Sequence, residues 1–206
     1  MWVVKIGGSL AGSAALARWV RAVATPAKTA VAIVPGGGEF ADAVRSAQRR
    51  EAFDDARAHR LAVAAMEQYG SLLCGLDDRL VPASTAEEIL NAQRRGRVPV
   101  WMAQRMALAA PEIPASWDVT SDSLAAWLAA RLAADALYLV KSVAPDGPGP
   151  IAASELTRRG VVDAAFPAMV ARGCFAMRWL GPEEHAAFAA ALRSGAICGA
   201  EIARNP

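Results

Sequence analysis

Cysteine and histidine are scarce in this chain of 206 residues, which contains three cysteines and two histidines. Cys74, Cys174 and Cys198 are odd in number and far apart, so they fit neither a disulfide framework nor the spacing of a structural metal site. His59 and His185 have no nearby partner in the sequence. We therefore expect free thiols in a reducing cytoplasm and no metal site.

An excess of charge of one sign and a long apolar run are also lacking. The net charge is +2, and no basic run exceeds two adjacent arginines, so we expect no nucleic-acid partner. Arg131 and Asp135 interrupt the most apolar segment, residues 124–140, so we expect no membrane span. A strand pattern begins at Trp2 and leaves no room for a signal peptide. These absences predict a cytoplasmic protein.

What the chain does contain is an alternation of strand and helix patterns. Short runs rich in β-branched and apolar residues predict strands at residues 2–6, 29–34, 97–101, 136–143, 174–180 and 196–202. Apolar residues at helical spacing predict helices at residues 13–23, 39–48, 54–73, 87–95, 164–172 and 183–192, and another that begins after Thr120. This alternation predicts an α/β fold with a mostly parallel sheet and helices on both faces.

The spacing of apolar residues predicts which face of two helices is buried. A loop is predicted to divide the chain into two lobes. In the helix at 54–73 we expect Leu61, Ala65, Tyr69 and Leu72 to face inward. Leu124, Trp127, Leu128 and Leu132 form the expected buried stripe of the helix after Thr120, for which Thr120 is the expected N-cap. The proline-containing stretch 108–116 separates an N-terminal lobe, about residues 1–110, from a C-terminal lobe, about residues 117–206, within one continuous sheet.

The predicted carboxyl ends of the strands gather polar and glycine residues. In parallel sheets, ligands bind beyond these ends. They carry Lys5 with Gly7, Gly8 and Ser9, the turn Gly36–Gly38, and Lys141 with Asp146 and Gly147, while Asp122 opens a helix at the same rim. Glycines let the backbone approach a ligand closely, and lysine suits an anion with several oxygens, such as a polyphosphate. Neither a Walker A loop nor a dinucleotide fingerprint is present.

Each of these features also has a simpler explanation. Lys5 and Lys141 are alternatively rim lysines that reach water, and Gly36–Gly38 is alternatively a plain turn. Asp122 is alternatively only a capping carboxylate at the start of its helix. Their joint placement on one rim is what favours a site.

Three motifs, in order, resemble those of the amino acid kinase superfamily, which includes the acetylglutamate, aspartate and uridylate kinases. They are Val4-Lys-Ile-Gly-Gly-Ser-Leu10, Pro35-Gly-Gly-Gly-Glu-Phe40 and Thr120-Ser-Asp-Ser-Leu-Ala-Ala126, and Cys198-Gly-Ala-Glu-Ile202 is similar to the family's closing strand. Within the superfamily, residues 58–70 and 120–128 most resemble kinases of 5-(aminomethyl)-3-furanmethanol phosphate, which act in the pathway to methanofuran-type one-carbon carriers. The resemblance implies a three-layer, carbamate kinase-like sandwich as a single domain, residues 1–206, and a homo-oligomer.

The resemblance also implies roles for individual residues in phosphoryl transfer from ATP, which brings Mg²⁺. Lys5 matches the lysine that bridges donor and acceptor, and Asp122 matches the carboxylate that orients the active-site lysines. Gly7, Gly8 and Ser9 match the phosphate loop, Gly36, Gly37 and Gly38 match the turn that holds an acceptor oxygen, and Lys141, Asp146 and Gly147 match the region that touches the nucleotide phosphates. The N-terminal lobe is then expected to bind the acceptor and the C-terminal lobe the nucleotide.

The chain departs from the acetylglutamate kinases in two respects. Residues 160–169 contain no lysine where those enzymes have a second one, so Lys141 must supply that charge. No hairpin lid is evident, which argues for another small anionic acceptor. The leading candidate is a phosphorylated aminomethylfuran, converted to a diphosphate, with Arg45 as the extra cation and His59 as a second contact or a helix-face histidine. Alternatives are another small acid, a nucleoside monophosphate, or a non-catalytic protein that binds a nucleotide or oxyanion.

Overall fold

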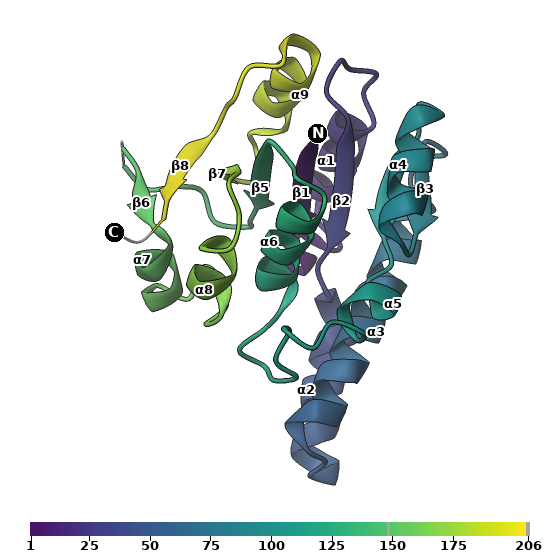
Figure 1. The fold of residues 1–206 in the computed structure, drawn as a ribbon, viewed down its shortest axis with the longest axis vertical. Coiled ribbons are helices and arrows are strands. Elements are labelled where there is room, and N and C mark those ends of the chain that lie inside the picture. Colours follow the sequence, from purple (N-terminus) through teal and green to yellow (C-terminus); the bar gives the residue numbers. More distant parts are fainter. Residues whose placement is uncertain (148, 205–206) are drawn as a thin grey trace.

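The computed structural model describes residues 1–147 and 149–204, and its centre is an eight-stranded sheet (Figure 1). The strands lie in the order β3-β4-β2-β1-β5-β7-β8-β6. Their bounds are β1 Trp2–Ile6, β2 Val31–Pro35, β3 Leu80–Ala83, β4 Val98–Trp101, β5 Ala136–Val140, β6 Ile151–Ala152, β7 Ala176–Leu180 and β8 Ala200–Ala203. Among the described strands only β7 and β8 pair antiparallel, so the predicted, mostly parallel sheet is confirmed.

Helices follow most strands and cover both faces of the sheet. They are α1 Ala14–Val23, α2 Gly38–Glu51, α3 Asp55–Cys74, α4 Ala86–Arg94, α5 Gln104–Ala107, α6 Ser121–Arg131, α7 Ala153–Arg158, α8 Phe166–Val170 and α9 His185–Ser194, with a 3-10 turn at Gly8–Leu10. None of the helices in the described ranges has the length and apolar character needed to cross a membrane.

The sheet separates two hydrophobic cores, as the alternation of side chains along a strand requires. From β1, Val3 joins the core formed with Leu124 of α6 and Phe166 of α8. Its neighbour Val4 joins the opposite core, with Trp19 of α1 and Phe188 of α9. The expected three-layer arrangement is therefore confirmed.

Several elements differ from the sequence-based expectation. Strand β3, strand β6 and helix α7 were not predicted, and the strand expected at 97–101 is β4, which lies between β3 and β2. Pro82 weakens the strand pattern of β3, and β6 is two residues long, so neither gives a clear sequence signal. The strand expected at 136–143 ends at Val140.

The buried faces of two helices were also predicted wrongly in part. Leu61 and Leu72 of α3 are 42% and 38% exposed, while Val63 and Met66 face the core. In α6 there is no single buried stripe, because all residues from 121 to 129 are buried. The cause is that α6 lies against the sheet on one side and against α8 on another, so a helix with little amphipathicity fits there.

Residues 108–116 connect two halves of the sheet. Strands β1–β4 precede this stretch and β5–β8 follow it, and the halves meet where β1 pairs with β5. The division of acceptor and nucleotide binding between these halves stays a prediction. Strands β7 and β8 are connected through α9, so no β-hairpin lid occurs in the described ranges.

Candidate active site

Two glycine turns meet at the carboxyl ends of β1 and β2. The strands are parallel neighbours, with Ile6 opposite Pro35, so the residues that follow them emerge side by side. A Cβ atom on Gly8 would lie 2.1 Å from the backbone nitrogen of Gly38, and one on Gly36 would lie 2.3 Å from the backbone nitrogen of Gly8. Only glycine permits this contact, and Gly38 also has a positive φ of 54°.

The second turn opens into helix α2 without a side-chain cap. Gly37 occupies the N-cap position and provides no capping hydrogen bond. The first turn of a helix leaves backbone N–H groups without intrahelical acceptors, and these groups attract oxyanions. The meeting of the two turns therefore provides close backbone access for a phosphate.

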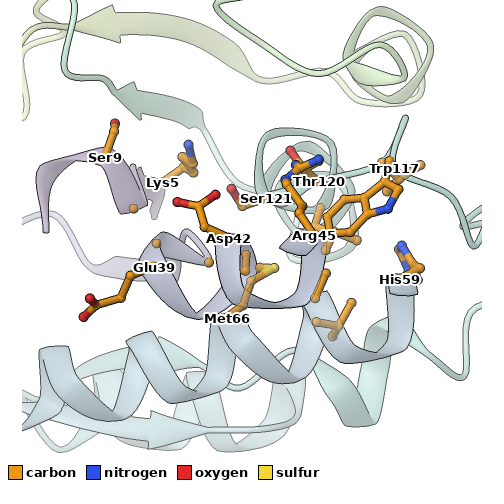
Figure 2. Close-up of a pocket in the computed structure, with 18 residues that line it drawn as sticks. Lys5, Ser9, Glu39, Asp42, Arg45, His59, Met66, Trp117, Thr120 and Ser121 are labelled. Carbon is orange, nitrogen blue, oxygen red and sulfur yellow. The ribbon is translucent and has the colours of Figure 1, made fainter. Parts of the chain in front are cut away.

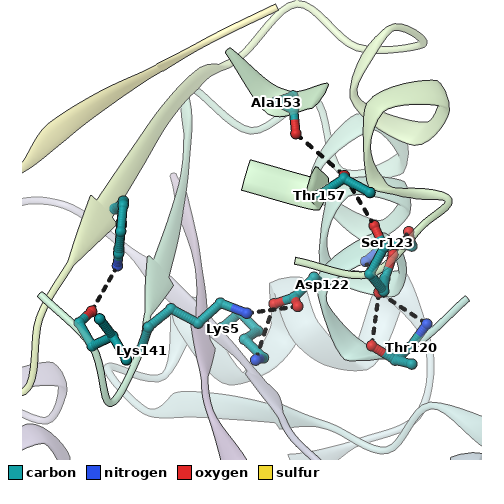
Figure 3. Close-up of polar contacts among 10 residues, drawn as sticks. Lys5, Thr120, Asp122, Ser123, Lys141, Ala153 and Thr157 are labelled. Atoms are coloured by element: carbon teal, nitrogen blue, oxygen red, sulfur yellow. Dashed lines mark hydrogen bonds and ion pairs between the residues drawn. The ribbon is translucent and has the colours of Figure 1, made fainter. Parts of the chain in front are cut away.

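Lys5, Asp122 and Lys141 form a buried charge cluster beside these turns (Figure 3). The Lys5 Nζ atom lies 3.0 Å from one carboxylate oxygen of Asp122, and the Lys141 Nζ atom lies 2.6 Å from the other. Lys5 is 5% exposed, so the alternative of a lysine that reaches water is wrong. Lys5 comes from β1, Lys141 directly follows the adjacent β5, and Asp122 lies in the first turn of α6.

The cluster carries one positive charge more than it has negative charges. Burial raises the pKa of Asp122, but the two neighbouring ammonium groups outweigh this effect and hold it below its usual value. Burial, reinforced by the charge of Lys5 and opposed by Asp122, lowers the pKa of Lys141 to about 8. Two ammonium groups fixed by one carboxylate suit an oxyanion that bears several negative charges.

A second carboxylate, Asp163, secures the start of α6. It accepts hydrogen bonds from the backbone nitrogens of Thr120 and Ser123, at 2.9 and 3.0 Å, and from both hydroxyl groups. Thr120 occupies the N-cap position as expected, but its side chain donates to Asp163 instead of capping the helix. Burial and the charge of Asp122 raise the pKa of Asp163, against the effect of these hydrogen bonds.

A cavity of about 290 Å³ adjoins Lys5 and lies between α2, α3 and residues 117–121 (Figure 2). Seven predicted site residues line it: Lys5, Gly8, Ser9, Gly37, Gly38, Arg45 and His59. Five residues that were not predicted to bind a ligand also line it: Asp42, Met66, Trp117, Thr120 and Ser121. Gly7 and Gly36 complete the two turns behind the cavity.

Arg45 lies at the far side of the cavity from Ser9 (Figure 2). Its guanidinium group is 3.8 Å from the centre of the Trp117 ring, and the Trp117 indole N–H donates to Gln48 at 2.6 Å. Arg45 forms no ion pair within the described ranges, so its N–H groups remain available to an anion.

His59 is buried in α3 and is 3% exposed. Its Nδ1 atom lies 3.2 Å from the carbonyl oxygen of Ser116, and burial lowers the pKa of the ring against the effect of this contact. The ring is therefore neutral near pH 7 and ties the loop before Trp117 to α3. A contact between His59 and an acceptor stays a prediction.

Asp146 and Gly147 are not brought to the cavity. The Asp146 carboxylate pairs with the Arg159 guanidinium group at 2.7 Å, and its side chain is 73% exposed. Gly147 has a φ of 93°, as a glycine turn permits. Their expected contact with nucleotide phosphates stays a prediction.

The fold and the cluster define an α/β protein with a candidate oxyanion site at the carboxyl ends of a parallel sheet. A model of the amino acid kinase family matches residues 1–145, so the chain belongs to this family. Over 129 residues the chain is 27% identical to a protein of Methanocaldococcus jannaschii named [5-(aminomethyl)furan-3-yl]methyl phosphate kinase. This match spans 62% of the chain and 59% of the length of that relative.

Solved structures show the same fold. The uridylate kinase of Archaeoglobus fulgidus superposes with a TM-score of 0.70 at 20% identity, covering 98% of this chain and 99% of that one. The UMP kinase of Bacillus anthracis gives a TM-score of 0.70 at 14% identity, with 100% and 96% covered. The UMP kinase of Ureaplasma parvum gives 0.66 at 17% identity, with 87% and 88% covered.

Proposed function

We propose that this protein transfers the γ-phosphoryl group of ATP to a small anionic acceptor. The observation that carries the proposal is the Lys5–Asp122–Lys141 cluster, fixed beside two abutting glycine turns and an open cavity. We further propose that the acceptor is a phosphorylated aminomethylfuran and the product its diphosphate. The name of the relative from M. jannaschii supports this choice.

The reaction requires one bond to form and one to break. An oxygen of the acceptor phosphate attacks the γ-phosphorus, and the bond between that phosphorus and the oxygen bridging to the β-phosphate breaks, releasing ADP. The attacking oxygen already carries negative charge, so no general base is needed. Phosphoryl transfer depends mainly on positioning and on positive charge around the transferred group.

The cluster supplies both requirements. Lys5 faces the cavity and stands between the proposed acceptor and donor phosphates, while Lys141 supplies the second positive charge. Asp122 holds both ammonium groups in place through its two oxygens. Lys141 thus supplies the positive charge that a second lysine provides in the acetylglutamate kinases, since residues 160–169 contain no lysine.

Magnesium would arrive with the nucleotide and neutralise part of its phosphate charge. Both oxygens of Asp122 are paired with lysines, so this carboxylate is not free to bind the ion. Within residues 1–147 and 149–204, no three His, Cys, Asp or Glu side chains are grouped to hold a metal.

Arg45 is proposed to hold the acceptor phosphate. Its guanidinium group is oriented by the Trp117 ring and is free of carboxylates in the described ranges. Arg45→Ala should raise the KM for a phosphorylated acceptor by the equivalent of about 1.5–3 kcal/mol, the worth of a charge-assisted hydrogen bond. The KM for ATP should stay the same.

The test is steady-state kinetics with ATP and four acceptors: the furan phosphate, acetylglutamate, aspartate and UMP. Lys5→Ala should lower turnover at least ~100-fold, the scale of one lost preorganised contact. The exposed Lys28, outside the site, provides the matched control in Lys28→Ala. Turnover of UMP or acetylglutamate but not of the furan phosphate would overturn the acceptor assignment, and ATP binding without turnover would favour a binding protein.

We also propose a homo-oligomer. Leu61, Leu72 and Leu76 expose apolar side chains along α3 and just after it, which offers a surface for a second copy. Light scattering after size exclusion should show more than one chain per particle, and a monomer at all concentrations would contradict this proposal.

A further inference from the structure

Asp42 presents a carboxylate to a cavity proposed to hold phosphate. Glu39, one turn earlier on α2, also lines the cavity, and both side chains are exposed. In Figure 2 the Asp42 carboxylate points toward Lys5 and Ser9, whereas that of Glu39 points away from them. Within the described ranges Asp42 forms no ion pair or hydrogen bond. Lys5 is paired with Asp122, and Arg45 lies on Trp117, so neither cation neutralises it.

A carboxylate in this position needs an explanation, because it repels a phosphate ligand. Stabilisation of the helix dipole is confined to the first turn of a helix. In α2 the acidic residue of the first turn is Glu39, so the dipole accounts for Glu39 and not for Asp42. An unpaired carboxylate in the same cavity as cationic side chains suits a ligand that carries both signs of charge.

We propose that Asp42 binds a primary ammonium group of the acceptor and makes the enzyme selective for acceptors that carry one. The inference rests on the proposed function and extends it from the phosphate to the whole acceptor, a zwitterion. Asp42 follows Gly38 by four residues, which is about 6 Å along a helix. That span suits a phosphate at the glycine turn, with the long Arg45 side chain reaching toward it across the cavity, and an ammonium on the other side of one small ring.

The remaining cavity wall fits the body of such an acceptor. Val63, Met66 and Leu124 line the cavity and provide apolar contact for a ring. The three kinds of lining then match three parts of the ligand: cations for the phosphate, apolar side chains for the ring and Asp42 for the ammonium.

The experiment compares the furan phosphate that bears an aminomethyl group with an analogue that bears a methyl group there. Wild-type enzyme should prefer the amine. Asp42→Asn should raise the KM for the amine roughly 10- to 100-fold, as for a lost charge-assisted hydrogen bond, and leave the methyl analogue unaffected. Glu39→Gln is the matched control, since it removes the same charge from the same helix and should keep the preference.

The outcomes separate the inference from the proposed function. If wild-type enzyme uses both compounds equally, or if Asp42→Asn keeps the preference, the inference is wrong and the proposed function stands. If Asp42→Asn loses the same activity with both compounds and added Mg²⁺ restores that activity, the carboxylate binds a metal, and the inference is also overturned. If wild-type enzyme uses neither compound, the acceptor assignment fails, but calorimetric titration of both compounds still tests the role of Asp42. The inference is supported if wild type binds the amine more tightly than the methyl analogue and Asp42→Asn does not. It is overturned if wild type binds the two compounds equally.

Discussion

Two buried carboxylates lie at the start of α6, those of Asp122 and Asp163, and they have different kinds of partners. On one side, the carboxylate of Asp122 faces two ammonium groups (Figure 3). On the other side, the carboxylate of Asp163 accepts hydrogen bonds from hydroxyl and backbone N–H groups. The pKa of Asp122 is lowered and that of Asp163 is raised, although both are buried in the same region. The difference shows that burial alone does not decide the direction of a pKa shift, because the neighbouring groups contribute as well.

The two carboxylates also divide the work of the site. Asp163 fixes the backbone at Thr120 and Ser123, on either side of Asp122. Asp122 is thereby held where it reaches Lys5 and Lys141 together. One carboxylate therefore positions the helix and the other positions the charge.

Replacement of Asp122 should have the largest effect. Asp122→Asn leaves two buried lysines without their shared anion, so turnover should fall at least ~100-fold. The free energy of unfolding should fall by about 3–5 kcal/mol, as when one partner of a buried ion pair is removed. Initial rates at saturating substrate and urea unfolding measure the two effects.

The matched control is Asp163→Asn, which replaces the carboxylate that binds Thr120 and Ser123 at the start of α6 and leaves the lysine contacts of Asp122 in place. Asparagine keeps one oxygen to accept from the helix start, so turnover should fall less than about tenfold and stability by about 1 kcal/mol. Equal losses of turnover in both variants would contradict the division of roles.

Much of this site could be predicted from the sequence, because its parts follow strand ends. The glycine turns and Lys5 directly follow or end apolar strand runs, and parallel strands bring such ends together. The convergence of Lys5, Asp122 and Lys141 was foreseen on that basis, and the structure brings them into contact.

The parts that were missed depend on contacts between distant segments. Asp163 reaches Thr120 across 43 residues, and no local pattern indicates that pairing. Asp42 lies in an ordinary polar stretch of α2, and only the direction of its side chain in the folded protein distinguishes it from Glu39, which also lines the cavity (Figure 2). In α3, Ala65 and Tyr69 are buried as predicted, but the exposed Leu61 and Leu72 have the same helical spacing, so periodicity alone placed these two leucines on the buried face.

Lys141 offers a second, smaller test through pH. With a pKa of about 8, it loses its positive charge as the pH rises through that value, which removes one of two cations for the nucleotide phosphates. The kcat/KM for ATP should then fall about tenfold per pH unit above about pH 8, since this parameter reports the free enzyme. Lys141→Arg keeps the charge at these pH values and should lack this decline, whereas the same decline in the variant would exclude Lys141 as its source.

The smallest expected effect concerns acid stability and sharpens the contrast between the two carboxylates. Because the folded pKa of Asp122 is lowered from 3.8, its ionised form stabilises the fold above that value, and this contribution is lost as the pH falls through the folded pKa. The contribution of Asp163 depends on pH in the opposite direction. Its folded pKa is raised, so its ionised form destabilises the fold, and protonation in acid removes this destabilisation. Urea unfolding should therefore show a weaker loss of stability below pH 3.8 for Asp122→Asn than for wild type. For Asp163→Asn the loss should be stronger as the pH falls toward 3.8 from above, because the variant lacks the relief that wild type gains there. A shift of both variants in the same direction would mean that the two carboxylates share one environment, and the comparison would fail.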